Sequence, residues 1–486
     1  MKTDSHPINK SRTSPPSMRK EGGDSSVTML FIVIALAAFV DGLDGTIVTT
    51  ALPDIADFFA VGATDSSWVI TIYFLVMAGL ILIFGRMCDK GALKRIIVAG
   101  FVVFAFGSLL CAFSQTFWML IVFRAVQGVG AGMLSASGIM IAVKYLPKSL
   151  TPLGLSISVL GYSIGGACGP ILGGVLTEYL DWGWIFLFNV PIGVVGAALA
   201  AKSVPKDVGF DRSHFDYIGS AFLFLAMVLG LYVVESTPSH GFGTMSAVLL
   251  AGFAVLMLLF VVRERKVSEP VLEFSVFRRP ATIAAIVVFL MINLVWMGVF
   301  YLLPFYMQIV LGYDLVLTGI ILCVQSVVTL VMCVPIGRRV PLKGNRHYVI
   351  LASLSLVATS VALIFAGYDS PIPMLVSVVF LGVIWGFGGG SLGNRIIDSV
   401  DADKRGAASP MVSFVIYLGC AIGSAIYSVL FSIGSGTQGA LIDELSPDTF
   451  MAGFTFTMIV GTVLSVLTLF LAWSFNEEKG SEASSS

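Results

Sequence analysis

The sequence predicts an all-α polytopic membrane protein with 14 transmembrane helices. Its 486 residues are 57% hydrophobic and only 12% charged, and the mean hydropathy is +0.95. An ordinary soluble domain carries about twice this share of charged residues. Long apolar segments recur along the chain, and basic residues avoid them. A chain this apolar cannot cover itself with a polar surface, so we expect it to lie in a lipid bilayer.

The predicted spans follow from length, because a helix needs about 20 mostly apolar residues to cross a bilayer. The tails 1–26 and 475–486 are polar, and the first lacks the apolar core of a signal peptide, so both are expected to be disordered. The spans are expected at 28–51, 66–84, 96–113, 117–143, 153–176, 184–201, 216–234, 244–262, 280–306, 314–336, 348–366, 372–393, 407–432 and 450–474.

The loops between these spans alternate in charge. Of the 28 Lys and Arg residues, only Arg124 lies inside a predicted span. All others lie in the tails or in even-numbered loops, whereas the odd-numbered loops carry acidic residues and no Lys or Arg. Positively charged loops stay in the cytoplasm. The pattern therefore predicts a multi-pass protein of the plasma membrane with both termini in the cytoplasm.

Two carboxylates lie inside the first predicted span, in the stretch FVDGLDGTIV. Asp41 and Asp44 are three residues apart, so they share one face of a helix. Each costs roughly 2.5–3.5 kcal/mol at the centre of a bilayer. Acidic groups in this position are expected to have a function.

Arg124 lies about seven residues into the fourth span, or roughly 10 Å from its outer end, which is about the depth expected for Asp44. An isolated guanidinium there is costly, and a carboxylate at the same depth offsets that cost. We expect Arg124 and Asp44 to be neighbours, directly or through a water or Gln127. Low dielectric favours the protonated carboxylate and arginine the charged one, so Asp41, Asp44 and Arg124 are candidate proton-coupling residues. The alternative is a purely structural knot between two helices.

Other features of the sequence argue against a bound nucleotide, metal or cofactor. The segment GFGGGSLG contains a G-x-G-x-x-G match, but it follows no strand, and the chain has no phosphate-binding loop. The six cysteines and four histidines lack metal-ligand spacing. No cofactor, metal, nucleotide or nucleic acid is therefore expected. The absence of a nucleophile or ligand cluster predicts that the protein is not an enzyme.

Several motifs together resemble the major facilitator superfamily, specifically its fourteen-span drug:proton antiporter branch. The motifs are LDGTIVTTALP, GRMCDKGALKR, RAVQGVGAG, GGACGPILGG, WGWIFLFNVPIG and FDYIG. The resemblance implies two six-helix halves, at 27–201 and 280–474, that rock about a central site. The linker 202–279 then carries two extra helices, at about 216–234 and 244–262.

The resemblance also assigns roles to two of these motifs. The loop after the second span braces the cytoplasmic gate, a role that falls on Gly85, Asp89, Lys90, Lys94 and Arg95; the alternative is a loop whose charges only set topology. The fifth span is the antiporter-motif helix, whose small residues permit close helix contact. Its residues are Gly165, Gly169, Pro170, Gly173 and Gly174.

The second half departs from the family pattern. Pro341 stands where the loop motif has an acid, and Ile416 stands where an arginine is common. Coupling is then expected to depend on the first half. Polar and aromatic residues in or near the spans are candidates for a substrate cavity, although packing or membrane-interface roles are the alternative for the aromatic ones. They are Gln127, Asn189, Trp296, Tyr301 and Gln325, and Tyr417 is a further aromatic candidate.

The favoured function is proton-coupled efflux of hydrophobic or cationic drugs by alternating access. The alternatives are export of one specific metabolite or antibiotic, and a membrane sensor that kept the fold without transport. The expected partners are a small-molecule substrate, protons and the lipid bilayer, and the protein is expected to be a monomer.

Overall fold

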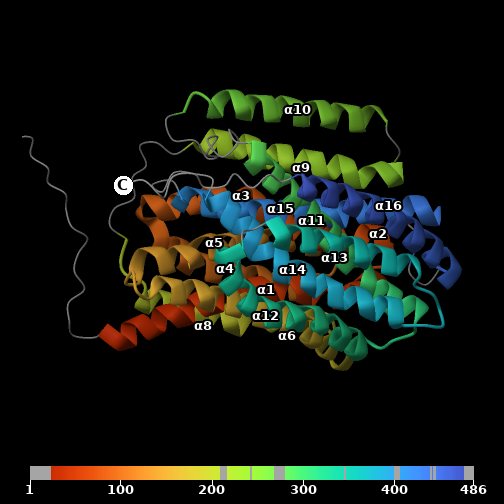
Figure 1. The fold of residues 1–486 in the computed structure, drawn as a ribbon, viewed down its shortest axis with the longest axis horizontal. Coiled ribbons are helices and arrows are strands. Elements are labelled where there is room, and N and C mark those ends of the chain that lie inside the picture. Colours follow the sequence, from red (N-terminus) through yellow and green to blue (C-terminus); the bar gives the residue numbers. More distant parts are fainter. Residues whose placement is uncertain are drawn as a thin grey trace, which may run out of the picture.

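The structure is a computed structural model that describes residues 23–207, 216–240, 243–267, 280–343, 346–398, 405–437, 441 and 445–474. The predicted tails lie almost entirely outside these residues. The described part consists of helices joined by short connections (Figure 1), and its only β-structure is one isolated antiparallel bridge between Gly62 and Leu441. Burying every backbone polar group in hydrogen bonds inside lipid requires this helical form.

Helices cover each predicted span. In the first part of the chain they are α1 (Gly23–Phe58), α2 (Ala63–Ser66), α3 (Trp68–Met87), η1 (Cys88–Ala92), α4 (Leu93–Ala112), α5 (Phe117–Tyr145), α6 (Thr151–Tyr179), α7 (Gly183–Leu187) and α8 (Asn189–Ser203). The central pair is α9 (Tyr217–His240) and α10 (Thr244–Glu264). The last part contains α11 (Pro280–Phe305), η3 (Tyr306–Val310), α12 (Leu315–Lys343), α13 (Arg346–Ile364), α14 (Ile372–Asp398), α15 (Arg405–Ser435) and α16 (Pro447–Trp473).

Some boundaries differ from the prediction. Helix α1 passes Pro53 and continues to Phe58, seven residues beyond the predicted end. Helix α12 extends to Lys343, so the segment expected as a loop is partly helical. Both segments are polar at their ends, and hydropathy stops a predicted span where polarity begins, although the helix continues past the apolar region.

Twelve described helical stretches are long and apolar enough to cross a membrane. One of them, Ala63–Ala112, contains two predicted spans, since helical bonding continues through η1 at the kink around Gly91. A further apolar stretch, Ile218–Val234, is shorter. The chain is therefore a multi-pass membrane protein, and the number of 14 crossings stays a prediction.

The helices pack in two groups with a central pair beside them. In the first group α1 packs on α6, and α5 packs on α3 and α4; in the second, α11 packs on α15, and α13 packs on α14 and α16. The groups meet mainly where α3 packs on α15 and α6 on α12. Helix α9 touches α3 and α15, and α10 lies outside α9 along one side of the bundle (Figure 1). We call the end with the connection 86–95 the basic end.

Helix α6 uses its small residues on two faces. Gly165, Gly169 and Gly173 face α1, where a side chain at Gly169 would stand 3.0 Å from the backbone nitrogen of Ile47. Gly174 faces α12 instead. Pro170 has no N–H for the Gly166 carbonyl, and that oxygen accepts a long hydrogen bond of 3.4 Å from Thr46. The small residues of α6 thus let its backbone contact both α1 and α12.

We expect Gly169→Ala to destabilise the protein, because the new methyl group meets backbone atoms of α1 that cannot turn aside. Overpacking of this kind costs about 1–3 kcal/mol. The matched control is Gly390→Ala on α14, where nothing lies within 4 Å of the added carbon. Thermal unfolding of the purified proteins in detergent measures both. A Gly169→Ala protein that melts at or above the wild-type temperature would contradict this packing.

Candidate functional site

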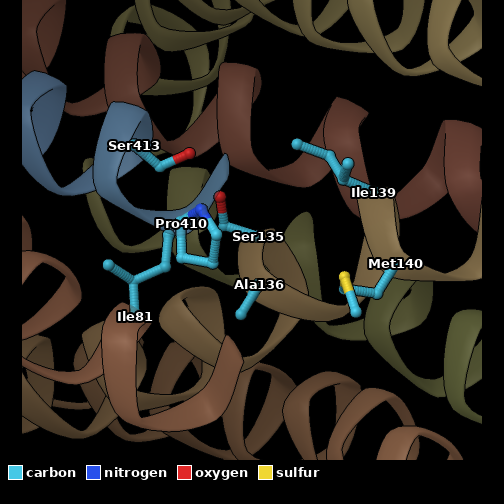
Figure 2. A pocket seen from close by; sticks show the side chains of 7 residues that line it. All are labelled: Ile81, Ser135, Ala136, Ile139, Met140, Pro410 and Ser413. Atoms are coloured by element: carbon cyan, nitrogen blue, oxygen red, sulfur yellow. The ribbon is translucent and has the colours of Figure 1, made fainter. Parts of the chain in front are cut away.

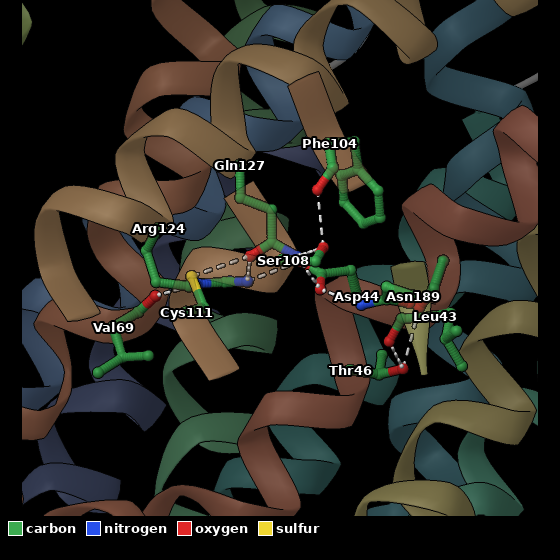
Figure 3. Close-up of polar contacts among 11 residues, drawn as sticks. Leu43, Asp44, Thr46, Val69, Phe104, Ser108, Cys111, Arg124, Gln127 and Asn189 are labelled. Carbon is green, nitrogen blue, oxygen red and sulfur yellow. Dashed lines mark hydrogen bonds and ion pairs between the residues drawn. The ribbon is translucent and has the colours of Figure 1, made fainter. Parts of the chain in front are cut away.

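Asp44 lies at the centre of a buried polar cluster. Its Oδ2 accepts a hydrogen bond of 2.7 Å from Nη1 of Arg124, and both side chains are essentially inaccessible. Its Oδ1 accepts from Nε2 of Gln127 at 2.8 Å and from Nδ2 of Asn189 at 2.9 Å (Figure 3). Both carboxylate oxygens are therefore bonded, as a buried charge requires.

The Arg124 side chain is held from several directions. Its Nε donates to the carbonyl of Val69 at 3.1 Å, and Nη1 also donates to Oε1 of Gln127 at 2.7 Å. The ring of Tyr73 lies 4.1 Å from the guanidinium carbon, and that of Phe186 lies 5.7 Å from it. Aromatic faces at these distances attract a cation. The guanidinium is thus fixed in one position between α1 and α3.

A second layer of hydrogen bonds fixes Gln127. Its Nε2 donates to the hydroxyl of Ser108 at 2.8 Å, and that hydroxyl donates to the carbonyl of Phe104 at 2.8 Å (Figure 3). The cluster therefore ties α1, α3, α4, α5 and α8 together. Sequence reasoning missed Ser108, although a serine inside a predicted apolar span is a usable signal.

Arg124 and Asp44 are neighbours, as expected. They are bonded to each other directly, and Gln127 is bonded to both. Gln127 and Asn189, which the sequence suggests for a substrate cavity, are instead fully buried and bonded to Asp44. Their polar groups therefore act on the carboxylate. The role of the cluster in proton coupling remains a proposal.

Asp41 belongs to a different set of contacts. Its Oδ2 accepts a hydrogen bond of 2.5 Å from the hydroxyl of Tyr417, and Ser135 lies 2.7 Å from that hydroxyl. These residues come from α1, α15 and α5, so Asp41 joins the two groups of helices. The sequence suggested Tyr417 only as an aromatic surface, and nothing in the sequence specifies which residue of α15 faces α1.

The loop at the basic end has partners that the sequence did not indicate. Asp89 lies 3.5 Å from Nζ of Lys144, and this ion pair is partly exposed. The backbone N–H groups of Lys94 and Arg95 donate to the carboxylate of Asp207, which caps the start of α4. Lys90 is half-buried in the same turn.

Gly85 lies at the contact between the two groups of helices near the basic end. A side chain there would stand 2.7 Å from the ring of Pro410 on α15. The gate position expected for Gly85 thus lies where α3 approaches α15 most closely at this end.

The remaining cavity candidates lie in the second group of helices. Trp296 stacks on Phe300 at a centroid distance of 5.2 Å and meets Trp385 edge-on at 6.0 Å. Gln325 is buried and donates to its neighbour Ser326. The hydroxyl of Tyr301 donates to the carbonyl of Ala63, so Tyr301 closes the end opposite the basic end. The indole nitrogen of Trp296 is buried without a hydrogen-bond partner among the described residues.

The described residues offer no metal site. No group of three or more His, Cys, Asp or Glu side chains among them is arranged to hold a metal ion. All six cysteines are free thiols.

Comparison with known proteins identifies relatives over most of the chain. The sequence profile of the Major Facilitator Superfamily matches residues 34–424. The riboflavin transporter RibZ of Clostridioides difficile is 28% identical over 409 residues, which cover 83% of this chain and 88% of RibZ. The putative multidrug resistance protein MdtD of Salmonella heidelberg is 28% identical over 419 residues, covering 85% and 88%.

A solved structure has the same fold. It is the crystal structure of a bacterial homolog of the human lysosomal transporter Spinster, in an inward-facing and unoccupied conformation. The TM-score is 0.65 at 15% sequence identity, and the match covers 93% of this chain and 97% of the other.

We expect Arg124→Gln to lower the melting temperature strongly, because it leaves a buried carboxylate without its cationic partner. Removing one member of a buried ion pair costs about 3–5 kcal/mol. The double variant Asp44→Asn with Arg124→Gln removes both charges and should melt above Arg124→Gln alone. Ser108→Ala, which removes only neutral hydrogen bonds, should cost about 1 kcal/mol. Strictly additive losses in the double variant would contradict the direct pairing.

Proposed function

The chain belongs to the Major Facilitator Superfamily, and we propose that it exports a hydrophobic or cationic small molecule in exchange for protons. The family and the relatives make it a membrane transporter rather than an enzyme. The proposal adds the direction, the coupling ion and the class of substrate.

The observation that carries the proposal is the buried charge in the first group of helices. Asp44 and Arg124 form an ion pair that no solvent reaches, and Asp41 lies one turn away on the same helix. A contact that only holds two helices together needs just one such pair. Among the described residues the second carboxylate, Asp41, has no cationic partner, so nothing there neutralises its charge. We therefore assign reversible protonation to Asp41 and Asp44, acting as a coupled pair with Arg124.

Protonation changes what each carboxylate can bind. A protonated Asp44 no longer neutralises Arg124, so the guanidinium must draw on Gln127 and on the Val69 carbonyl. A neutral Asp41 accepts a weaker hydrogen bond from Tyr417 than a charged one does. Protonation thus alters contacts within the first group of helices and between the two groups, and this links proton binding to a change in their relative position.

Alternating access requires the contacts at each end of the bundle to break in turn. Opposite the basic end, Ser428 donates to the carbonyl of Thr64 at 3.0 Å, and Gln308 donates to that of Thr50 at 3.2 Å. At the basic end Gly85 meets Pro410. These contacts are few and neutral, which favours their exchange. We propose that Asp89, Lys94 and Arg95 stiffen the loop beside this gate.

The proposed topology has 14 crossings, two six-helix halves at 27–201 and 280–474, and both termini in the cytoplasm of a plasma-membrane protein. The charge alternation of the loops supports it, and the basic end is then the cytoplasmic end. The central pair α9 and α10 contributes two crossings at the side of the bundle. We propose that the protein acts as a monomer.

A second candidate function is export of one planar metabolite. The relative RibZ is named a riboflavin transporter, and the cluster of Trp296, Phe300 and Trp385 offers flat aromatic surface with two indole nitrogens that have no partner among the described residues. A drug exporter and a metabolite exporter differ in breadth of substrate. The third alternative is a membrane sensor without transport, and such a protein does not require two buried carboxylates.

Proteoliposomes with an acidic interior test the proposed function. We expect the gradient to drive accumulation of ethidium, a planar cation, and comparison with riboflavin distinguishes the two exporter alternatives. Asp44→Asn should reduce gradient-driven accumulation at least about tenfold, which corresponds to ~1.4 kcal/mol, while exchange of labelled for unlabelled probe at equal pH persists. Asp57→Asn, the same change at an exposed position of α1, is the matched control.

Two results would count against the proposal. Full gradient-driven accumulation by Asp44→Asn assigns the ion pair a structural role only. No response of the wild-type protein to the gradient with either probe supports the sensor alternative.

A further inference from the structure

Two hydroxyl groups extend from Asp41 as a directed chain. Tyr417 gives its only hydroxyl proton to Oδ2 of Asp41, at 2.5 Å. Ser135 lies 2.7 Å from the same tyrosine oxygen. Because the tyrosine proton is already committed to the carboxylate, Ser135 must be the donor in the second bond. The chain therefore runs from Ser135 through Tyr417 to Asp41, with each hydroxyl donating toward the carboxylate.

A small cavity lies at the other side of Ser135. Its volume is about 10 Å³, and Ser135, Ala136, Pro410 and Ser413 are among the residues that line it (Figure 2). This volume is about the smallest that admits one water molecule, which needs polar partners. Ser135 and Ser413 are the lining residues that carry hydroxyl groups.

The position of the cavity gives the chain a direction across the bundle. Its wall also includes Met140, five residues beyond Ser135 toward the basic end, and Pro410 lies seven residues, or about two turns, from Tyr417 in the same direction. The opposite end of the bundle is closed by the bonds of Tyr301 and Ser428. In this conformation the cavity therefore lies between Asp41 and the basic end.

We propose that Ser135 and Tyr417 are a proton path that connects Asp41 with this cavity, and hence with the cytoplasm. The inference rests on the proposed function, in which Asp41 is protonated and deprotonated. It adds the route and assigns the hydroxyls of Ser135 and Tyr417 as the groups that relay the proton.

The transfer is balanced in bonds and charge. A hydrated proton in the cavity binds Oγ of Ser135, the serine proton passes to the oxygen of Tyr417, and the tyrosine proton passes to Oδ2 of Asp41. Three O–H bonds break and three form, both hydroxyls end neutral, and the carboxylate becomes a carboxylic acid. The transfer leaves both hydroxyl protons on the cavity side, so the same steps in reverse release the proton, and rotation of both hydroxyls resets the chain for another uptake.

The surroundings of Asp41 leave the chain as its main polar contact. The titratable groups that act on Asp41 are Asp44 on its own helix, Tyr73 on α3, Tyr162 on α6, and Cys420 beside Tyr417 on α15. None of these carries a positive charge, and Arg124 is bonded to Asp44. The hydroxyls of Tyr417 and Ser135 therefore join Asp41 to the cavity.

Time-resolved infrared spectroscopy after a pH jump tests the path on the full chain in detergent. The carboxylic C=O band that Asp41→Asn removes reports protonation of Asp41. We expect Ser135→Ala to slow the rise of this band at least about tenfold, with little change in the midpoint of its pH titration, because the Tyr417 bond remains. Ser135→Thr restores a hydroxyl and should restore the rate.

Two further variants keep the test sharp. Ala136→Val fills the cavity without removing a hydrogen bond, so it should also slow the band if Ser135→Ala fails to fold. Ser137→Ala on the same helix removes a hydroxyl that donates only to backbone carbonyls, and its rate should equal that of the wild type.

The outcomes separate the path from the proposed function. Wild-type rates in both Ser135→Ala and Ala136→Val overturn the path and leave Asp41 as a proton site. Absence of any carboxylic band that depends on Asp41 overturns both the path and the proposed role of Asp41, whatever the hydroxyl variants do.

Discussion

The cost of a charge in hydrocarbon organises this molecule. Arg124 is the one Lys or Arg residue inside the predicted spans. A carboxylate, an amide, a backbone carbonyl and two aromatic rings surround its guanidinium. These groups come from α1, α3 and α7 and from α5 itself, so satisfying one guanidinium fixes four helices against one another. In a bilayer, where apolar helix surfaces gain little by leaving lipid, such polar contacts and close backbone packing take the place of the hydrophobic driving force between helices.

The two carboxylates of α1 occupy contrasting environments although they are one turn apart. Asp44 is held by three donors and belongs wholly to the first group of helices. Asp41 accepts its shortest hydrogen bond from Tyr417, which comes from α15. The first carboxylate is therefore suited to hold a structure in place, and the second to report on the distance between the two groups. A transporter that couples proton binding to movement needs both properties on one rigid element.

The sequence predicted the features that follow from the cost of polar groups in lipid. It did not predict the contacts that depend on how two helices are aligned against each other. Fourteen apolar segments, the lone Arg124 and the depth of Asp44 are all read from the cost of polarity in lipid, and each agrees with a helix or a contact in the structure. The contact of Asp41 with Tyr417 depends on how α1 and α15 lie against each other, which no local pattern specifies. The Asp207 cap was missed for the same reason, since 113 residues separate it from Lys94.

The backbone contact between α6 and α12 has a consequence for movement. Around Pro170 and Gly319 the two helices meet without intervening side chains, and Gly174 continues the contact toward Leu315. Interlocked side chains resist shear because they must leave their grooves before the helices can slide. Backbone surfaces of this kind have no such barrier, so α6 and α12 can slide past each other while remaining in contact.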